Sequence, residues 1–285
     1  ADLPDPALIV LTDVSAAVKT LIQYKTDGRV KIVERNGIRP SQFPQLKAEL
    51  TNDAGFDDII MLAPTQAEWV GEAAKLTAFR GTFNLVGTAP LNGSVQVDVG
   101  RIHYHYTAYV GNAGPDIAAS YGEARNRCDL QPGGAAVFVG AGGPMGQMHV
   151  QRAIELKNGP RLIIATEVNE MRLAALAELF APLAEAHGKQ LLTFNPATEA
   201  DSLRDFVMNA TDQIGADDVV VCVPVASLMA EAGTYMAPDG MLVLFAGVPN
   251  GTMAELDVSA IYLHNAQFTG TCLLYTSDAA DELLG

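Results

Sequence analysis

The sequence predicts an α/β protein made of two consecutive doubly wound parallel sheets, of which the first is truncated at its N-terminus. Three observations predict this fold class. Short apolar runs alternate with segments of helical periodicity, a complete strand–glycine-turn–helix unit begins at Ala135, and four blocks of sequence recur in the same order. Strict alternation of strands and helices indicates βαβ units and a mostly parallel sheet.

Composition excludes several classes of protein before any element is placed. Of the 285 residues, 49% are apolar and 18% are charged, which is typical of a globular chain and not of a disordered one. The net charge of −15 disfavours nucleic acid as a partner. No apolar run approaches the length of about 18 residues that a membrane span needs. We therefore expect neither a nucleic-acid nor a membrane partner.

The cysteines are few and widely separated. Cys128, Cys222 and Cys272 form no CxxC pair and have no histidine at ligand spacing, which argues against a zinc knuckle or a disulfide framework. This usage favours a cytoplasmic location. The first ten residues have neither an initiating Met nor the basic segment of a signal peptide, so we expect them not to be the natural start.

The last stretch of the chain, residues 272–285, has an unusual sequence. It reads CLLYTSDAADELLG and resembles the conceptual translation of a sequencing adaptor. We interpret it as a non-native tail and leave it out of the fold prediction, as for a fusion scar. The alternative is a native amphipathic tail.

An internal repeat organises the rest of the chain. Four blocks recur at offsets of about 154 to 160 positions: 6–14 with 160–168, 55–64 with 215–224, 84–87 with 244–247, and 98–102 with 257–261. We interpret them as a duplicated unit of about 155 residues. The predicted domains are 1–126, a repeat that lacks its first strand and glycine loop, and 127–271, a complete dinucleotide-binding (Rossmann-like) domain.

The second copy shows every element of such a domain. Its predicted strands are 135–139, 161–166, 190–194, 217–223, 241–246 and 266–269. Its predicted helices are 145–156, 170–185, 199–213 and 226–236. A short helix at 116–127 is expected to join the two copies.

A glycine loop follows the first strand of the second copy. Gly140 permits a tight turn, Gly142 and Gly143 let the backbone approach a pyrophosphate, and Gly146 lets the next helix pack against the sheet. The N-terminus of that helix, at Pro144 and Met145, offers backbone N–H groups to phosphates. The spacing is one residue longer than the usual G-x-G-x-x-G, and the alternative is a mere tight turn.

An acidic residue ends the second strand, where a dinucleotide site needs one. Glu167 lies 21 residues after Gly146, and a carboxylate there accepts hydrogen bonds from the adenine ribose. It would repel a 2′-phosphate, so NAD is favoured over NADP, although Arg172 lies one helical turn away and could pair with a phosphate. Asp13 holds the equivalent place in the first copy. The alternative for Glu167 is a solvated residue at a strand end.

Two further loops should complete the site. Ligands of open parallel sheets lie outside the carboxyl ends of the strands, so the loops after the fourth and fifth strands should flank the nicotinamide. The alternative is that Pro224 and Gly247 only stop their strands. The candidate residues in these loops are Val223, Pro224, Val225, Ala246, Gly247 and Val248.

These motifs resemble a known family. The glycine loop 140–146, the segments 166–169, 195–198 and 223–225, and the run 237–247 are similar to zinc-type medium-chain dehydrogenases, within them to the L-sorbose-1-phosphate reductase branch. The resemblance covers 127–271 well and 6–111 more loosely. It implies NAD(P)-dependent interconversion of an alcohol, such as a polyol or sugar phosphate, and a ketone.

The resemblance is incomplete. In that family zinc and its ligands sit in a separate catalytic domain, and no residue here matches those ligand motifs. Zinc is therefore expected only in a part that this chain lacks, and the catalytic residues are unknown. Family dimers join their cofactor sheets through the last strands. We therefore hypothesise that the strands ending at Gly111 and Gly270 pair within one chain as an internal pseudo-dimer, with a homo-oligomer as the alternative.

Other functions were weighed against this interpretation. A non-catalytic dinucleotide sensor and an S-adenosylmethionine-dependent methyltransferase share the glycine loop and the acid.

The segment 101–109 alternates in the manner of a strand and carries His103 and His105, for which structural or surface roles are favoured over a metal site. His149 is expected to pack or to lie at the surface.

Overall fold

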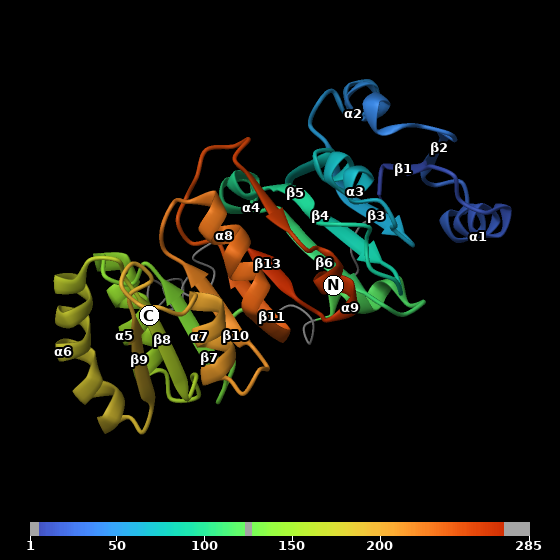
Figure 1. Cartoon of the computed structure of the whole chain (residues 1–285). Coiled ribbons are helices and arrows are strands. Elements are labelled where there is room, and N and C mark those ends of the chain that lie inside the picture. Colours follow the sequence, from blue (N-terminus) through green and yellow to red (C-terminus); the bar gives the residue numbers. More distant parts are fainter. Residues whose placement is uncertain (1–5, 123–126, 271–285) are drawn as a thin grey trace, which may run out of the picture. The chain divides into compact units, whose positions relative to one another are not determined.

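The computed structural model describes residues 6–122 and 127–270 (Figure 1). The chain forms two compact units, Ala1–Asp53 and Ala54–Gly285. The division between them falls inside the predicted first repeat. The tail predicted at 272–285, with Cys272, and part of the joining helix predicted at 116–127 lie outside the described residues.

The first unit is small and contains one parallel pair of strands. Strand β1 pairs with β2 in a register that sets Leu8 opposite Lys31. Helix α1 begins where it does because the Ser15 side chain accepts a hydrogen bond from the N–H of Val18 at 3.3 Å. The elements are β1 (Leu8–Leu11), α1 (Ala16–Thr26), β2 (Lys31–Glu34), η1 (Pro40–Gln42) and α2 (Phe43–Thr51).

The second unit holds all the remaining elements. Its first part contains β3 (Phe56–Leu62), α3 (Ala67–Ala74), β4 (Thr77–Val86), β5 (Val95–Asp98), α4 (Val99–Tyr104), β6 (Ala108–Asn112) and η2 (Ile117–Tyr121). Its second part begins with β7 (Ala135–Val139), α5 (Pro144–Glu155), β8 (Leu162–Thr166), α6 (Glu170–Ala186), β9 (Gln190–Phe194) and α7 (Leu203–Ala210). It ends with β10 (Ala216–Val221), α8 (Ala226–Ala232), η4 (Gly233–Tyr235), β11 (Met236–Val243), β12 (Met253–Leu256), α9 (Ser259–Leu263) and β13 (Gln267–Thr269).

A nine-stranded sheet runs through the second unit in the order β3-β4-β6-β13-β11-β10-β7-β8-β9 (Figure 1). Every neighbouring pair is parallel except β6 and β13, which are antiparallel. The predicted α/β fold with a mostly parallel sheet is therefore confirmed. Strands β7 and β9 have the predicted bounds, whereas α7 is shorter than the predicted 199–213 because Ser202 caps its start, accepting from the N–H of Asp205 at 3.1 Å.

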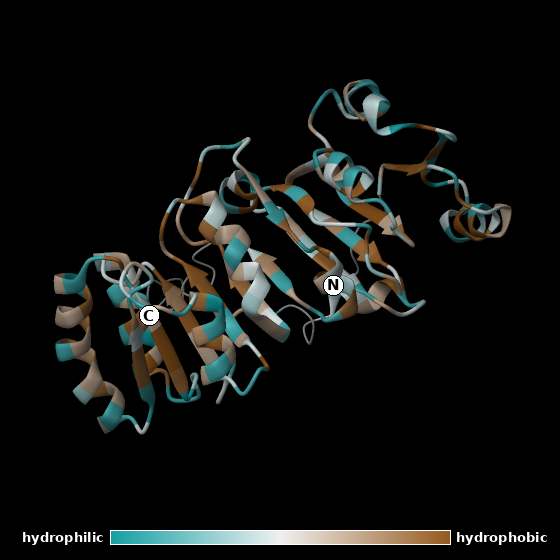
Figure 2. Cartoon of the chain, viewed as in Figure 1, coloured by the Kyte–Doolittle hydropathy of each residue, from teal (hydrophilic) through white to brown (hydrophobic). Residues whose placement is uncertain are grey.

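The centre of this sheet is buried on both faces. All residues of β7 and β8 are buried, as a parallel sheet covered by helices requires. On one face, Phe138 of β7 and Ile163 of β8 share a core with Ile154 of α5 and with Leu176 and Phe180 of α6. In Figure 2 the strands in this part of the sheet are mostly brown, the colour of apolar residues.

Two antiparallel pairings show a common offset. Tyr109 of β6 pairs with Phe268 of β13, and Gln96 of β5 pairs with Glu255 of β12, so both pairs join residues 159 positions apart. Asp98 and Asp257, which the sequence repeat aligns, are separated by the same interval. Both pairings thus join positions that the predicted sequence repeat would align.

Strand β3 differs from β10 in its partners. Strand β10 pairs with β7 on one side and β11 on the other, and its residues Val219 to Val221 are fully buried. Within the described residues β3 pairs only with β4, and Ile60 and Leu62 are 46% and 47% exposed. In chain order, strands β1 to β6 correspond one by one to strands β8 to β13. Within the described residues no strand precedes β1, so β7 has no counterpart there.

One predicted element is wrong. The alternating segment 101–109 does not form a strand, because α4 covers Val99–Tyr104 and β6 begins only at Ala108. The Asp98 side chain accepts from the N–H of Arg101 at 3.2 Å and so begins a helix there. His103 is therefore helical and His105 caps the helix end, so the two imidazoles do not project from one strand.

No helix in the described ranges has the length and apolar character to cross a membrane.

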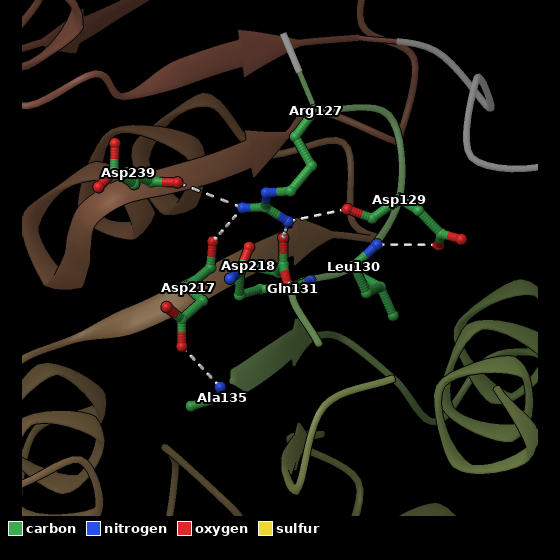
Figure 3. A network of polar contacts seen from close by, with 8 residues as sticks. All are labelled: Arg127, Asp129, Leu130, Gln131, Ala135, Asp217, Asp218 and Asp239. Atoms are coloured by element: carbon green, nitrogen blue, oxygen red, sulfur yellow. Dashed lines mark hydrogen bonds and ion pairs between the residues drawn. The ribbon is translucent and has the colours of Figure 1, made fainter. Parts of the chain in front are cut away.

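A buried ion pair holds the segment before β7 against β10 (Figure 3). Arg127 donates to the carboxylate of Asp218 and, at 2.8 Å and 3.0 Å, to the backbone carbonyls of Asp129 and Asp217. The second oxygen of Asp218 accepts from the N–H of Gln131 at 2.7 Å. Burial nevertheless raises the pKa of Asp218 to about 6. The carboxylate therefore depends on these donors to remain charged at neutral pH.

We expect Arg127→Leu to lower the free energy of unfolding by about 3–5 kcal/mol, because it leaves Asp218 buried without a counter-charge. Denaturation in urea, followed by the fluorescence of Trp69, measures the change. The double variant Arg127→Leu/Asp218→Leu should recover most of the loss. Arg204→Leu is the control, since its pair with Asp205 is long, 3.7 Å, and more than half exposed on both sides. Equal stability of Arg127→Leu and Arg204→Leu would contradict the expectation.

His149 of α5 is buried in an aromatic environment. Its ring lies 4.3 Å from that of Phe245 in an edge-to-face arrangement and 6.3 Å from that of Phe138 in a stacked one. The residue is 2% exposed, and burial lowers its pKa from 6.5 to about 4. The imidazole is therefore neutral at pH 7, and the prediction that it packs or lies at the surface is resolved in favour of packing.

The folded protein should lose stability from this residue as pH falls from about 6.5 to about 4. Across that window the unfolded chain takes up a proton at His149 and the folded chain does not, so stability is highest above the window. The full effect is on the order of 3 kcal/mol. Urea unfolding of the wild type and of His149→Gln at pH 7.5 and 4.5 measures this effect. Both proteins contain the other titrating groups, such as Asp218, so the difference between their losses of stability reports on His149. The variant should lose less stability on acidification; an identical loss in both proteins would refute a buried neutral imidazole.

Candidate cofactor site at the glycine turn

The turn between β7 and α5 has the backbone that the glycine pattern predicts. Gly140 has φ +76°, a left-handed conformation that favours glycine, and a Cβ there would clash with the side chain of Val223. Its N–H donates to the Thr166 hydroxyl at 3.2 Å, and the N–H of Ala141 donates to the Thr166 carbonyl at 2.7 Å. These bonds fix the turn to the end of β8.

The other glycines of the loop fall into two kinds. A Cβ on Gly146 would lie 2.6 Å from Cα of Ala141, so backbone packing excludes a side chain there. A Cβ on Gly142 would lie 2.7 Å from the carboxyl carbon of Glu167, so a side chain there would require the Glu167 carboxylate to move. Gly143 differs, because a Cβ there would have no atom within 4 Å and φ is an ordinary −79°. The protein itself does not require glycine at 143, and the open space lies at the N-terminus of α5.

Helix α5 begins at this open space. Gly143 is the residue before the helix and Pro144 occupies its first turn, where the missing N–H costs no helical hydrogen bond. Pro144 and Met145 are exposed. The first N–H groups of a helix have no partner within it and carry a partial positive charge, so this end suits a phosphate.

Glu167 lies against the loop, at the carboxyl end of β8. Its side chain contacts Gly142, and its Oε1 accepts from the N–H of Asn169 at 3.0 Å. Arg172 is exposed in the first turn of α6, where its N–H donates to the Asn169 side chain at 3.0 Å. The structure therefore brings Glu167 to the glycine loop and leaves Arg172 on the outer surface of the next helix.

The loops after β10 and β11 lie at the same edge of the sheet as the glycine turn. Val223 faces Gly140, and the N–H of Ala246 donates to the carbonyl of Val221 at 3.0 Å. Strand β7 pairs with β8 on one side and β10 on the other, so the strand order reverses at the glycine turn, where dinucleotides bind to doubly wound sheets. Pro224 and Val225 are exposed, Gly247 is half-buried and Val248 is buried.

Cys222, next to this edge, is not an activated nucleophile. Burial raises the pKa of its thiol to about 12, so the thiolate is scarcely populated at neutral pH. Among residues 6–122 and 127–270, no three His, Cys, Asp or Glu side chains are arranged to hold a metal ion. The donor set of the described part therefore does not fit a zinc centre.

Residues from α4 approach the loop after β11, a contact that sequence reasoning missed. Nδ1 of His103 lies 3.0 Å from the Leu244 carbonyl. A Cβ on Gly247 would lie 2.9 Å from Cζ of Tyr104 and 3.2 Å from Nε2 of His103. In the sequence, Gly247 belongs to a block that recurs in both predicted copies, which indicates a constrained position. The sequence does not indicate which segment packs on this glycine.

Asp13, the counterpart of Glu167 in the repeat, is engaged within the first unit. Its carboxylate accepts from the N–H of Gly37 at 2.9 Å, and its own N–H donates to the Asn36 side chain at 2.9 Å. A hollow of about 240 Å³ lies at the amino end of β11, and its lining includes no residue of the glycine turn. Met236, Pro238, His264 and Phe268 are among its lining residues.

Comparison with known proteins gives partial matches. No family model matches the chain. Over 120 residues, 41% of this chain, it is 32% identical to mannitol-1-phosphate 5-dehydrogenase of Aliivibrio fischeri, and it covers 28% of that protein. Over 118 residues it is 29% identical to L-sorbose 1-phosphate reductase of Klebsiella pneumoniae, covering 27% of it. The chain thus spans under a third of the length of these curated relatives.

Solved structures give a similar extent of likeness. The alcohol dehydrogenase TADH of Thermus sp. ATN1 aligns with 54% of this chain and 40% of its own, at a TM-score of 0.41 and 22% identity. Benzyl alcohol dehydrogenase of Acinetobacter calcoaceticus aligns with 56% of this chain and 40% of its own, at 0.43 and 22%. What the comparisons establish is thus a similarity to two curated oxidoreductases over 41% of this chain.

Proposed function

We propose that residues 127–270 bind NAD(H) and that the chain is the nucleotide-binding portion of an NAD(P)-dependent oxidoreductase. The observation that carries the proposal is Gly143, a glycine that packing inside the protein does not require, at the N-terminus of α5. A phosphate approaching that helix end would need the space that a side chain at 143 would fill. The partial sequence similarity to two sugar-phosphate oxidoreductases supports it independently.

The proposed reaction oxidises an alcohol, a polyol or sugar phosphate, to the matching ketone. In the opposite direction it reduces the ketone to the alcohol. This class rests on the names of the two similar proteins, which act on mannitol 1-phosphate and L-sorbose 1-phosphate. The cofactor, when bound, would accept or donate the hydride. The residues of this chain would bind and orient it, with the pyrophosphate at Gly143, the adenine ribose at Glu167 and the nicotinamide end near Val223 and Gly247.

We further propose that the first half of the chain (residues 6–112) and the second half (residues 127–270) are copies of one unit. The two halves would be joined as an internal pseudo-dimer through β6 and β13. The common offset of 159 residues in two antiparallel pairings supports this, as does the shared order of elements in 8–112 and 162–269. In this proposal the dinucleotide binds at the glycine loop of residues 140–146, which is one site within the described residues. Calorimetric titration should then give a stoichiometry near one.

Gly143→Ala should abolish most NADH binding without weakening the fold. Its φ of −79° suits alanine and its Cβ would meet no protein atom within 4 Å, so the Trp69-monitored unfolding midpoint should match the wild type. The added methyl would occupy the phosphate space, and we expect affinity for NADH, followed by cofactor fluorescence, to fall by about ten-fold or more.

Gly93→Ala is the matched control, because a Cβ at Gly93 also meets no atom within 4 Å but lies away from the glycine turn in the sequence. Unchanged NADH binding by Gly143→Ala would overturn the proposed phosphate position. A parallel titration of the wild type with S-adenosylmethionine decides whether the loop instead serves that cofactor.

Glu167→Ala should weaken NADH binding by about ten-fold, because a charged acceptor for the ribose hydroxyls is lost. It should also narrow the preference for NADH over NADPH, since the carboxylate that repels a 2′-phosphate is gone. Titrations with both cofactors measure the two effects. Glu170→Ala, exposed in the first turn of α6, is the control and should change neither affinity. A Glu167→Ala protein with the wild-type ratio of affinities would contradict the assignment.

A further inference from the structure

The loop after β11 depends on residues from the other half of the chain. Residues 98–105, which comprise the end of β5 and helix α4, make polar contacts along residues 244–252. His103 Nδ1 lies 3.0 Å from the Leu244 carbonyl, and His105 Nε2 lies 2.9 Å from the side-chain nitrogen of Asn250. The Asp98 carboxylate accepts from the N–H of Gly251 at 2.9 Å. The shape of this loop is therefore fixed largely from outside its own half.

Tyr104 lies beside the loop after β11. Its phenol lies against Gly247, where any side chain would collide with the hydroxyl oxygen, and its ring packs edge-on against His103 with centroids 4.6 Å apart. The residue is nevertheless 53% exposed. The hydroxyl thus lies beside the loop, and about half of the residue remains accessible to a ligand.

The histidine beside it has a defined tautomer in this contact. A carbonyl oxygen can only accept, so Nδ1 of His103 must donate to Leu244. The other nitrogen, Nε2, lies on the side of Gly247, at 3.2 Å from the position of a Cβ there. With Nδ1 as the donor to Leu244, the imidazole turns Nε2 toward the loop, next to the Tyr104 hydroxyl.

The strand order of the sheet indicates which end of a bound dinucleotide would lie beside Tyr104 and His103. With the pyrophosphate at the end of β7 and the adenosine half on the β8 side at Glu167, the remaining half must extend over β10 and β11. Gly247 follows β11, two strands from β7, a separation of about 10 Å at the usual strand spacing. The nicotinamide riboside end therefore lies over the loop that Tyr104 touches.

We propose that the Tyr104 hydroxyl, supplied by the first half, contacts the nicotinamide riboside of a dinucleotide bound to the second half. The inference rests on the proposed function and deepens it. The phenol would hydrogen-bond a hydroxyl or amide of that end of the cofactor, and His103 would position the phenol. The dinucleotide site is then incomplete without the first half, which gives the internal pairing of β6 with β13 a functional role.

Calorimetric titration of the full chain with NADH and with ADP-ribose tests this, because ADP-ribose lacks the nicotinamide. Tyr104→Phe should weaken NADH binding by about five-fold, the usual effect of one lost hydrogen bond, and leave ADP-ribose binding within about two-fold. Tyr104→Ala should show a larger effect of the same kind. Tyr106→Phe is the control, since Tyr106 packs on Phe79 and Arg80 instead.

Each other outcome overturns a distinct claim. If Tyr104→Phe and Tyr104→Ala weaken both ligands equally, Tyr104 only supports the loop, and if they weaken neither, it does not touch the ligand; both results reject the inference and leave the proposed function intact. If the wild type binds neither NADH nor ADP-ribose, the proposed function fails and the inference fails with it.

Discussion

The antiparallel pairing of β6 with β13 is the interaction on which the rest of the second unit depends. It joins two sets of parallel strands into one sheet, and the β5–β12 pairing beside it repeats the same offset of 159 residues. Because of this join, α4 packs on the loop after β11, where a Cβ on Gly247 would lie 2.9 Å from Cζ of Tyr104, and on the end of β13, where a Cβ on Gly270 would lie 2.5 Å from Cα of His103. The loop after β11 is therefore packed against the first half.

A second constraint acts at the glycine turn, where backbone and carboxylate approach each other closely. Gly146 is required by backbone packing and Gly140 by its left-handed φ, whereas a side chain at 142 would require the Glu167 carboxylate to move. A Cβ on Gly143 would meet no protein atom within 4 Å. The open space at Gly143 is where the proposed dinucleotide would place its pyrophosphate.

The parts of this account that sequence predicted are those governed by local rules. The buried strand at 135–139, the glycine turn and the acid at the end of β8 follow from periodicity and spacing, and the structure brings Glu167 to Gly142 as expected. The segment 101–109 was wrongly predicted as a strand. The alternation of its aromatic residues is typical of a strand, and the prediction did not consider Asp98, whose side chain caps the start of a helix. Arg127 was missed because its partner Asp218 is 91 residues away, although a charged residue in an apolar strand signals that some partner must exist.

Amide chemical shifts of the isotope-labelled full chain, recorded during a titration with NAD⁺, test the proposed dinucleotide site most directly. We expect saturable shifts at the amides of Gly140 to Gly146, apart from Pro144, which has no N–H, and of Glu167, with a second group at Ala246 to Val248. Those three segments come from the ends of β7, β8 and β11, so a common binding curve would show that they form one site. Saturable shifts confined to another region, such as the Asp13 segment, or no saturable shifts at all, would contradict it.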